Sequence, residues 1–88
     1  MIDNMPQGYN IGWETTGNKC VTTGACPASR PFGGYYLRFE TIIWNWDESS
    51  QEQDKRTNMR DMIIHRSEKE AKKVHGYIVN NLKKEDNQ

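Results

Sequence analysis

The run from Tyr35 to Trp46 constrains the fold more than any other part of the chain, because it is dense in aromatic and β-branched side chains. Such side chains favour a β-strand. Successive side chains of a strand point to opposite faces, so the run has two distinct sides. We assign to the core the side that carries Tyr35, Leu37, Phe39, Thr41 and Ile43. The other side carries Tyr36, Arg38, Glu40, Ile42, Trp44 and Trp46.

Two shorter segments before this strand predict a β-hairpin. Residues 9–15 and 19–23 have the composition of strands, and the Thr-Gly-Asn sequence at residues 16–18 is typical of the turn between them. The next segment, residues 24–31, contains Pro27 and Pro31. Proline cannot donate a hydrogen bond to a sheet, so we expect a loop there.

Residues 47–57 are polar and predict an exposed connection. Ser49 followed by Glu52 matches the capping box that starts helices, which allows a helical turn within this connection. Met59–His65 has two interpretations. As helix it would merge with the following segment into one element of about 35 residues, whereas helices average ~11–12 residues. We therefore expect a strand that pairs with the strand at 35–46.

The C-terminal part predicts an amphipathic helix from about residue 68 to residue 84. Ser67 and Glu70 form a second capping-box pattern at its start. The expected buried stripe consists of Ala71, Val74, Ile78 and Leu82, with Tyr77 at its edge. Residues 85–88 are expected to fray. Together these elements predict an α+β fold, a small twisted antiparallel sheet of three to four strands with one C-terminal amphipathic helix.

Length and charge limit the functional classes. Residues 1–88 suit one domain, mainly β over residues 7–65 and helical over residues 67–84. Twelve basic and twelve acidic residues give a formal net charge of zero, which argues against a general nucleic-acid binder. No stretch approaches the ~18 apolar residues that a membrane span needs. Residues 1–7 lack the basic start and apolar run of a signal peptide. We therefore expect a cytoplasmic protein.

The chain carries none of the familiar catalytic or phosphate-binding motifs. Cys20 or Cys26 could form a nucleophile pair with His65 or His75, but nothing in the sequence places them together. We expect two free thiols, because cytosolic thiols usually stay reduced, with a disulfide as the alternative. Zinc would need two further ligands. The expectation is a non-enzymatic protein with no cofactor and no metal.

Aromatic side chains and an arginine on the second side of the 35–46 strand indicate binding to a macromolecule. Tryptophan, tyrosine and arginine are favoured at the centres of protein interfaces. We therefore predict a small intracellular protein that acts by protein–protein contact, as an inhibitor or adaptor of the kind that phages and mobile elements encode. Its predicted contact residues are Tyr36, Arg38, Trp44 and Trp46. The competing interpretation is that the helix covers these rings and that they form the core.

Nucleic acid is the alternative partner. The segment from Lys55 to Lys84 holds nine lysines and arginines against three acidic residues. A basic helix surface could bind phosphates while Trp44 or Trp46 stacks on bases. The residues predicted for that role are Arg66, Lys69, Lys72, Lys73 and Lys83. The same charges could instead serve only to solvate the helix, and homodimerisation through an unpaired strand edge is a third expectation.

The order of strands followed by a basic helix resembles the small sheet-plus-helix modules of plant transcription factors and integrase arm-binding domains. The resemblance rests on Met59 to Leu82, about a quarter of the chain, and concerns architecture alone. The preceding strands depart from it, because they offer mainly Lys19, Arg38 and Arg60 in place of a dense basic pattern. We recognise no family signature in the chain.

Overall fold

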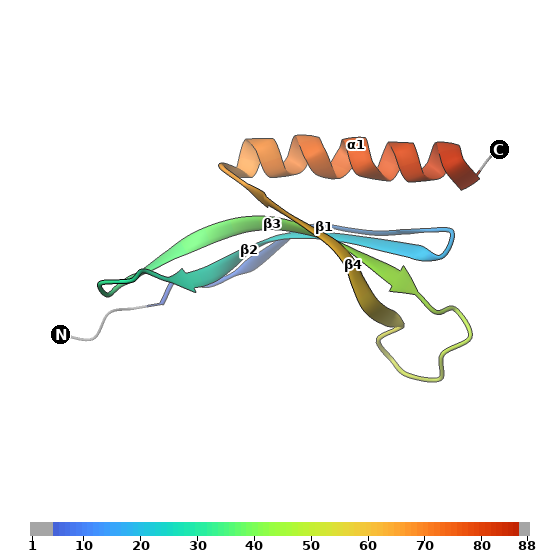
Figure 1. Cartoon of the computed structure of the whole chain (residues 1–88), viewed down its shortest axis with the longest axis horizontal. Helices are drawn as coiled ribbons and strands as arrows, with labels where there is room; N and C mark the ends of the chain where they lie inside the picture. The colour runs from blue at the N-terminus through green and yellow to red at the C-terminus, as the bar shows by residue number, and fades with distance from the viewer. Residues whose placement is uncertain (1–4, 87–88) are drawn as a thin grey trace.

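Each stretch of alternating or β-branched residues becomes a strand, and the strands pair with their neighbours along the chain. The computed structural model describes residues 5–86, which form an antiparallel sheet of order β1-β2-β3-β4 with one helix on one face (Figure 1). The predicted α+β fold is therefore confirmed. The elements are β1 (Tyr9–Thr16), β2 (Lys19–Ser29), β3 (Tyr35–Trp46), β4 (Arg56–His65) and α1 (Glu68–Asp86).

β3 has the bounds that its composition predicts, and it lies between β2 and β4. Thr41 is paired with Thr23 of β2 on one side and with Ile63 of β4 on the other. The segment that could have been strand or helix is a strand, as expected, and it begins at Arg56. β3 and β4 thus form a hairpin, and the polar segment between them is its loop.

The prediction of a loop over residues 24–31 was wrong, because β2 continues through Pro27 to Ser29. Pro27 pairs with Leu37 of β3, whereas the pairing between β1 and β2 ends at Tyr9 and Ala25. Past Ala25 one side of β2 is therefore a sheet edge. A proline is tolerated in a strand where no neighbouring strand needs its missing N–H.

The helical turn allowed by Ser49 and Glu52 does not form. The backbone N–H and the hydroxyl of Ser49 both donate to Oδ1 of Asp47, at 3.1 and 2.7 Å. The backbone N–H of Glu52 donates to the hydroxyl of Ser50 at 3.1 Å. Such short side-chain-to-backbone bonds stabilise turns in place of a helix. The connection from β3 to β4 is therefore a turn-rich loop.

The second capping-box pattern does start a helix, as predicted. The N–H of Glu70 donates to the hydroxyl of Ser67 at 3.1 Å, and the carboxylate of Glu70 accepts from the N–H of Arg66 at 3.2 Å. These bonds satisfy backbone donors that a helix start leaves free. α1 continues to Asp86, past the predicted end at residue 84. Residues 87 and 88, where fraying was also expected, lie outside the described residues, as do residues 1–4.

The buried line of α1 is turned relative to the predicted stripe. Its centre consists of Ala71, His75 and Val79, which are almost fully buried. Tyr77, expected at the edge of the stripe, is 67% exposed. The reason lies in β1, where a Cβ atom at Gly12 would stand 2.6 Å from Nε2 of His75. Gly12 therefore leaves the space that lets a histidine, instead of an aliphatic residue, pack against the sheet.

A chain of hydrogen bonds crosses the layer between α1 and the sheet. Its five members come from α1 and all four strands, and they are Glu14, His75, Thr23, Thr41 and His65. Nε2 of His75 lies 3.2 Å from Oε1 of Glu14, and Nδ1 lies 2.7 Å from the Thr23 hydroxyl. That hydroxyl lies 2.7 Å from the hydroxyl of Thr41, which lies 2.8 Å from Nε2 of His65. This chain ties the helix to the sheet by polar contacts.

The apolar core is correspondingly small. Among the described residues, the buried hydrophobic side chains are Cys20, Val21, Ala25, Ala71 and Val79. The shortest extent of the molecule is 18 Å, which corresponds to one helix layer on one sheet layer. Within residues 5–86, α1 lacks the long apolar stretch that a membrane-spanning helix requires. No helix or second sheet of the described chain lies over the face that points away from α1 (Figure 1).

Candidate functional site

The uncovered face of the sheet, here called the open face, gathers the three tryptophans of the chain together with Tyr36. Strand alternation and the pairing registers place its residues. Thr41 and Thr23, which bond toward α1, lie on the covered face, so their strand neighbours point the other way. The open face includes Trp13, Cys20, Thr22, Gly24, Cys26, Tyr36, Arg38, Glu40, Ile42, Trp44, Trp46, Arg56, Met62 and Ile64.

Three tryptophans form the end of the open face near the β1–β2 turn. The indole N–H of Trp44 donates to the Thr22 hydroxyl at 2.9 Å, and the guanidinium of Arg56 lies 5.2 Å above its ring. The indole N–H of Trp46 donates to Glu48 at 2.6 Å. Trp13 and Trp46 pack edge to face, with ring centroids 5.5 Å apart. The indole N–H groups of Trp44 and Trp46 are therefore satisfied, and these two rings are held in fixed orientations.

The other two predicted contact residues lie further along β3. Tyr36 is 40% exposed, and the guanidinium of Arg30 lies 5.3 Å from its ring centre. Arg38 bonds the carboxylate of Glu40 through Nε at 3.2 Å and Nη2 at 3.0 Å. Eight residues separate Tyr36 from Trp44, about 26 Å at the rise of a strand. The structure thus brings the four predicted residues to one face, in a line along it instead of at one point.

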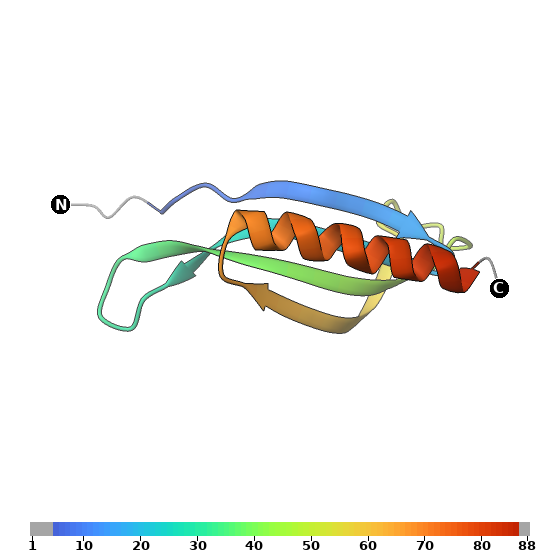
Figure 2. The same cartoon turned by 90° about the horizontal axis from the view of Figure 1, so that it is seen from above.

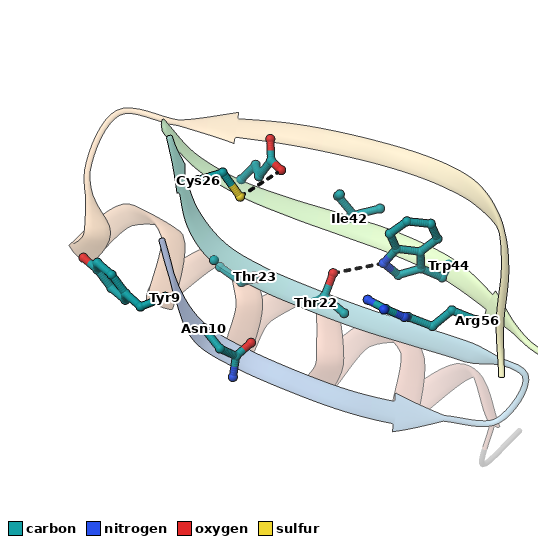
Figure 3. Close-up of a pocket in the computed structure, with 10 residues that line it drawn as sticks. Tyr9, Asn10, Thr22, Thr23, Cys26, Ile42, Trp44 and Arg56 are labelled. Carbon is teal, nitrogen blue, oxygen red and sulfur yellow. Dashed lines mark hydrogen bonds between the residues drawn. The ribbon is translucent and has the colours of Figure 1, made fainter. Parts of the chain in front are cut away.

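A hollow of about 250 Å³ lies in the middle of this line (Figure 3). Gly24 of β2 pairs with Asn10 and with Glu40, and a Cβ atom on Gly24 would stand 3.0 Å from the backbone oxygen of Tyr9. The lining residues are Tyr9, Asn10, Thr22, Thr23, Gly24, Cys26, Glu40, Ile42, Trp44 and Arg56. The sequence analysis missed this hollow. Its one signal is a glycine inside a strand, which often marks a close approach or a ligand.

The arginines of the open face already have acidic partners. Arg38 is paired with Glu40, which is only 9% exposed. Arg56 binds both carboxylate oxygens of Asp54, with the shortest contact at 2.6 Å. These bonds lower the pKa of Asp54 to about 2. The open face is therefore aromatic and close to electrically neutral.

Both cysteines are free thiols on β2, as expected. Cys26 follows Cys20 by six positions, about 20 Å along a strand, so the two thiols cannot bond to each other. Burial raises the pKa of the Cys20 thiol. Burial, and then the hydrogen bond to Glu40, raises the pKa of Cys26. Neutral thiols are poor nucleophiles, so neither environment activates cysteine for chemistry.

The histidines lie on the covered face and the cysteines on the open face, so the structure does not join them into a pair. Among residues 5–86, no three side chains of histidine, cysteine, aspartate or glutamate come together as metal ligands. Phe32, which the sequence analysis passed over, is fully exposed at the tip between β2 and β3. Its position between Pro31 and Gly33 was the only signal.

The predicted basic residues lie on the other side of the molecule. Arg66, Lys69, Lys72, Lys73 and Lys83 are all exposed on α1 or just before it. Lys72 lies 3.6 Å from the carboxylate of Glu68, one turn earlier. Trp44 faces away from α1 (Figure 3), and strand alternation places Trp46 on the same face. The structure therefore does not bring the basic helix and the tryptophans into a single surface.

No family model matches the sequence, and no curated protein or solved structure is significantly similar to it. Any functional assignment rests on the geometry of these surfaces.

Proposed function

We propose that this domain is a non-enzymatic protein-binding module and that the open face is its contact surface. The observation that supports the proposal is an uncovered sheet face with apolar side chains that remain exposed. Trp13 is 45% exposed, Met62 45% and Ile64 55%. Contiguous apolar surface of this kind is typical of interaction sites.

The chemistry of the open face favours a protein over other macromolecules. Tryptophan, tyrosine and arginine contribute most to protein interfaces. Trp44 and Trp46 are fixed by hydrogen bonds, so binding would cost little further side-chain entropy. Arg38 and Arg56 already have carboxylate partners, so a partner can cover them without leaving an unpaired charge. A hollow beside Trp44 could receive one protruding side chain.

An inhibitor or adaptor is the kind of protein that such a surface suits. Both act by covering a site on a partner, and neither needs a catalytic group. We place the domain in the cytoplasm, where two free thiols would stay reduced. A phage or mobile-element origin remains part of the proposal.

The exposed cations of α1 support a second candidate function, the binding of nucleic acid. Binding through Lys69, Lys73 and Lys83 would be electrostatic and would weaken steeply with salt. Fluorescence anisotropy of labelled single- and double-stranded oligonucleotides tests it. Binding at low salt that disappears in the double variant Lys69→Glu, Lys73→Glu would establish this function. Its absence at low salt would remove the candidate.

The leading proposal is tested by capture of partners from the cells that produce the protein, after nuclease treatment. The informative variant is Tyr36→Asp, which places a charge on the open face at a partly exposed position. The matched control is Lys69→Glu, Lys73→Glu, which alters the helix side. We expect the control to retain the partner and Tyr36→Asp to lose it. A partner that binds Tyr36→Asp as well as wild type would contradict the proposal.

A further inference from the structure

β4 is an edge strand that the helix leaves uncovered. It pairs with β3 on one side only, whereas α1 packs mainly against β1 and β2. Seen from above, β4 lies beside the helix and not under it (Figure 2). Three consecutive apolar residues of β4 are exposed: Met62 at 45%, Ile63 at 39% and Ile64 at 55%. A free edge with apolar side chains is a template for another strand.

These apolar residues point to both faces of the sheet. Met62 and Ile64 are on the open face, and Ile63, paired with Thr41, is on the face that carries α1. A partner that covers only the open face would leave Ile63 in water. A strand added to the edge would place side chains beside all three.

Bulges confine the regular part of this edge to a short stretch. The β3–β4 register shifts on both sides of Trp44, so that Arg60 and Asn58 have no counterpart on β3. Asn58 also has a positive φ of 27°. Bulges protect an edge from further pairing. The residues from Asp61 to His65 keep a regular register and contain one acidic side chain, so they stay available.

We propose that β4 pairs antiparallel with β4 of a second copy of this chain, with Ile63 opposite Ile63. In this register Met62 lies opposite Ile64 of the second copy, and Asp61 lies opposite His65. Directly opposed side chains have Cβ atoms about 4.5–5.5 Å apart, so each pair is in contact. The two sheets become one continuous sheet, and both open faces lie on the same side of it.

The residues of β4 complement those of a second β4 in this register. This self-complementarity indicates that the strand added to the edge comes from a second copy of the chain. A register centred on Met62 would place Ile63 against Asp61, and one centred on Ile64 would place Ile63 against His65. Only the register centred on Ile63 sets apolar against apolar and an acid against an imidazole.

Sedimentation equilibrium of the purified full chain, from micromolar to submillimolar concentration, tests the pairing. The expected wild-type mass is twice the 10.3 kDa of one chain. Ile63→Lys should weaken association at least tenfold, because it sets two ammonium groups opposite each other. The matched control is Met59→Lys, on the same strand and 53% exposed, but beyond the bulge at Arg60. It should associate like wild type.

A wild type that stays monomeric over the whole range would overturn the inference, as would a dimer that Ile63→Lys leaves intact. Circular dichroism checks the fold of Ile63→Lys, and Ile64→Lys replaces it if it does not fold. Tyr36→Asp separates this inference from the proposed function. If Tyr36→Asp dissociates the dimer and Ile63→Lys does not, the copies meet through the open face and the β4 pairing is wrong. Capture of a partner protein through the open face is independent of either result.

Discussion

The hydrogen-bond chain between α1 and the sheet fixes where its protons lie. A neutral His75 that donates from Nε2 to Glu14 has an unprotonated Nδ1, which must accept from Thr23. Thr23 then accepts from Thr41, and Thr41 accepts from Nε2 of His65. Only this distribution satisfies every link with both histidines neutral. It leaves Nδ1 of His65 as an acceptor with no donor, in agreement with its lack of a partner.

His65 should therefore make stability depend on pH. Burial lowers its pKa below 6.5, an effect that Glu70 partly opposes. Below pH 6.5 the His65 imidazole therefore binds a proton more readily in the unfolded chain than in the folded chain. The free energy of unfolding decreases as the pH falls through this range. Urea unfolding at a series of pH values measures this. In His65→Gln the decrease over the same window should be smaller, and an equal decrease in both proteins would refute the assignment.

Cys26 should respond to the charge of Glu40. Burial and then the hydrogen bond to this carboxylate raise the pKa of the thiol above 9.0, and only the thiolate reacts with alkylating agents. Glu40→Gln removes the negative charge and frees the positive charge of Arg38, and both changes lower the thiol pKa. We expect severalfold faster alkylation of Cys26 by iodoacetamide, followed by mass spectrometry of the peptides. An unchanged or slower rate would show that burial alone controls the thiol.

Two glycines offer a matched test of how α1 sits on the sheet. A Cβ at Gly12 would lie 2.6 Å from the His75 ring, whereas nothing lies within 4 Å of a Cβ at Gly76. Gly12→Ala should therefore lower the free energy of unfolding by about 1–3 kcal/mol through overpacking. Gly76→Ala should raise it by about 1 kcal/mol, because alanine favours a helix interior. Urea unfolding of both variants gives the two values, and effects of the same sign would contradict the described helix position.

The sequence predicts the elements whose signals are local. Eight of the twelve residues of β3 are aromatic or β-branched, and the start of α1 has a side-chain cap at Ser67. The bounds of β3 and the start of α1 could therefore be predicted from the sequence. The second half of β2 was not, because Pro27 is acceptable only where β1 has ended, and that depends on the pairing of distant residues.

The packing face of α1 and the hollow on the open face could not be predicted from the sequence either. His75 looks polar in a periodicity analysis, and it is buried only because Gly12 and Thr23 lie beneath it. The alternation of β3 did predict which side chains share the open face with Trp44. It could not show whether α1 covers that side, since either face of β3 carries enough aromatic and aliphatic residues to pack against a helix.

At the scale of the whole molecule, one helix covers one face of a four-stranded sheet, and the contact between them is partly polar. The buried hydrophobic side chains of the described chain are small or medium in size, such as Val21 and Ala71. The three tryptophans lie instead on the open face. The account therefore separates the residues that hold the fold together from the residues that are proposed to contact a partner.

The free energy of unfolding of Trp46→Ala, measured in urea, tests that separation most directly. Trp46 packs edge to face on Trp13 at one end of the open face, with no helix over it. Loss of this contact and of the bond to Glu48 should cost about 1 kcal/mol each, or about 2 kcal/mol together. A core tryptophan replaced by alanine costs about 3–5 kcal/mol. A value of about 2 kcal/mol or less would support the open face as a contact surface, and a value in the core range would make its rings part of the core.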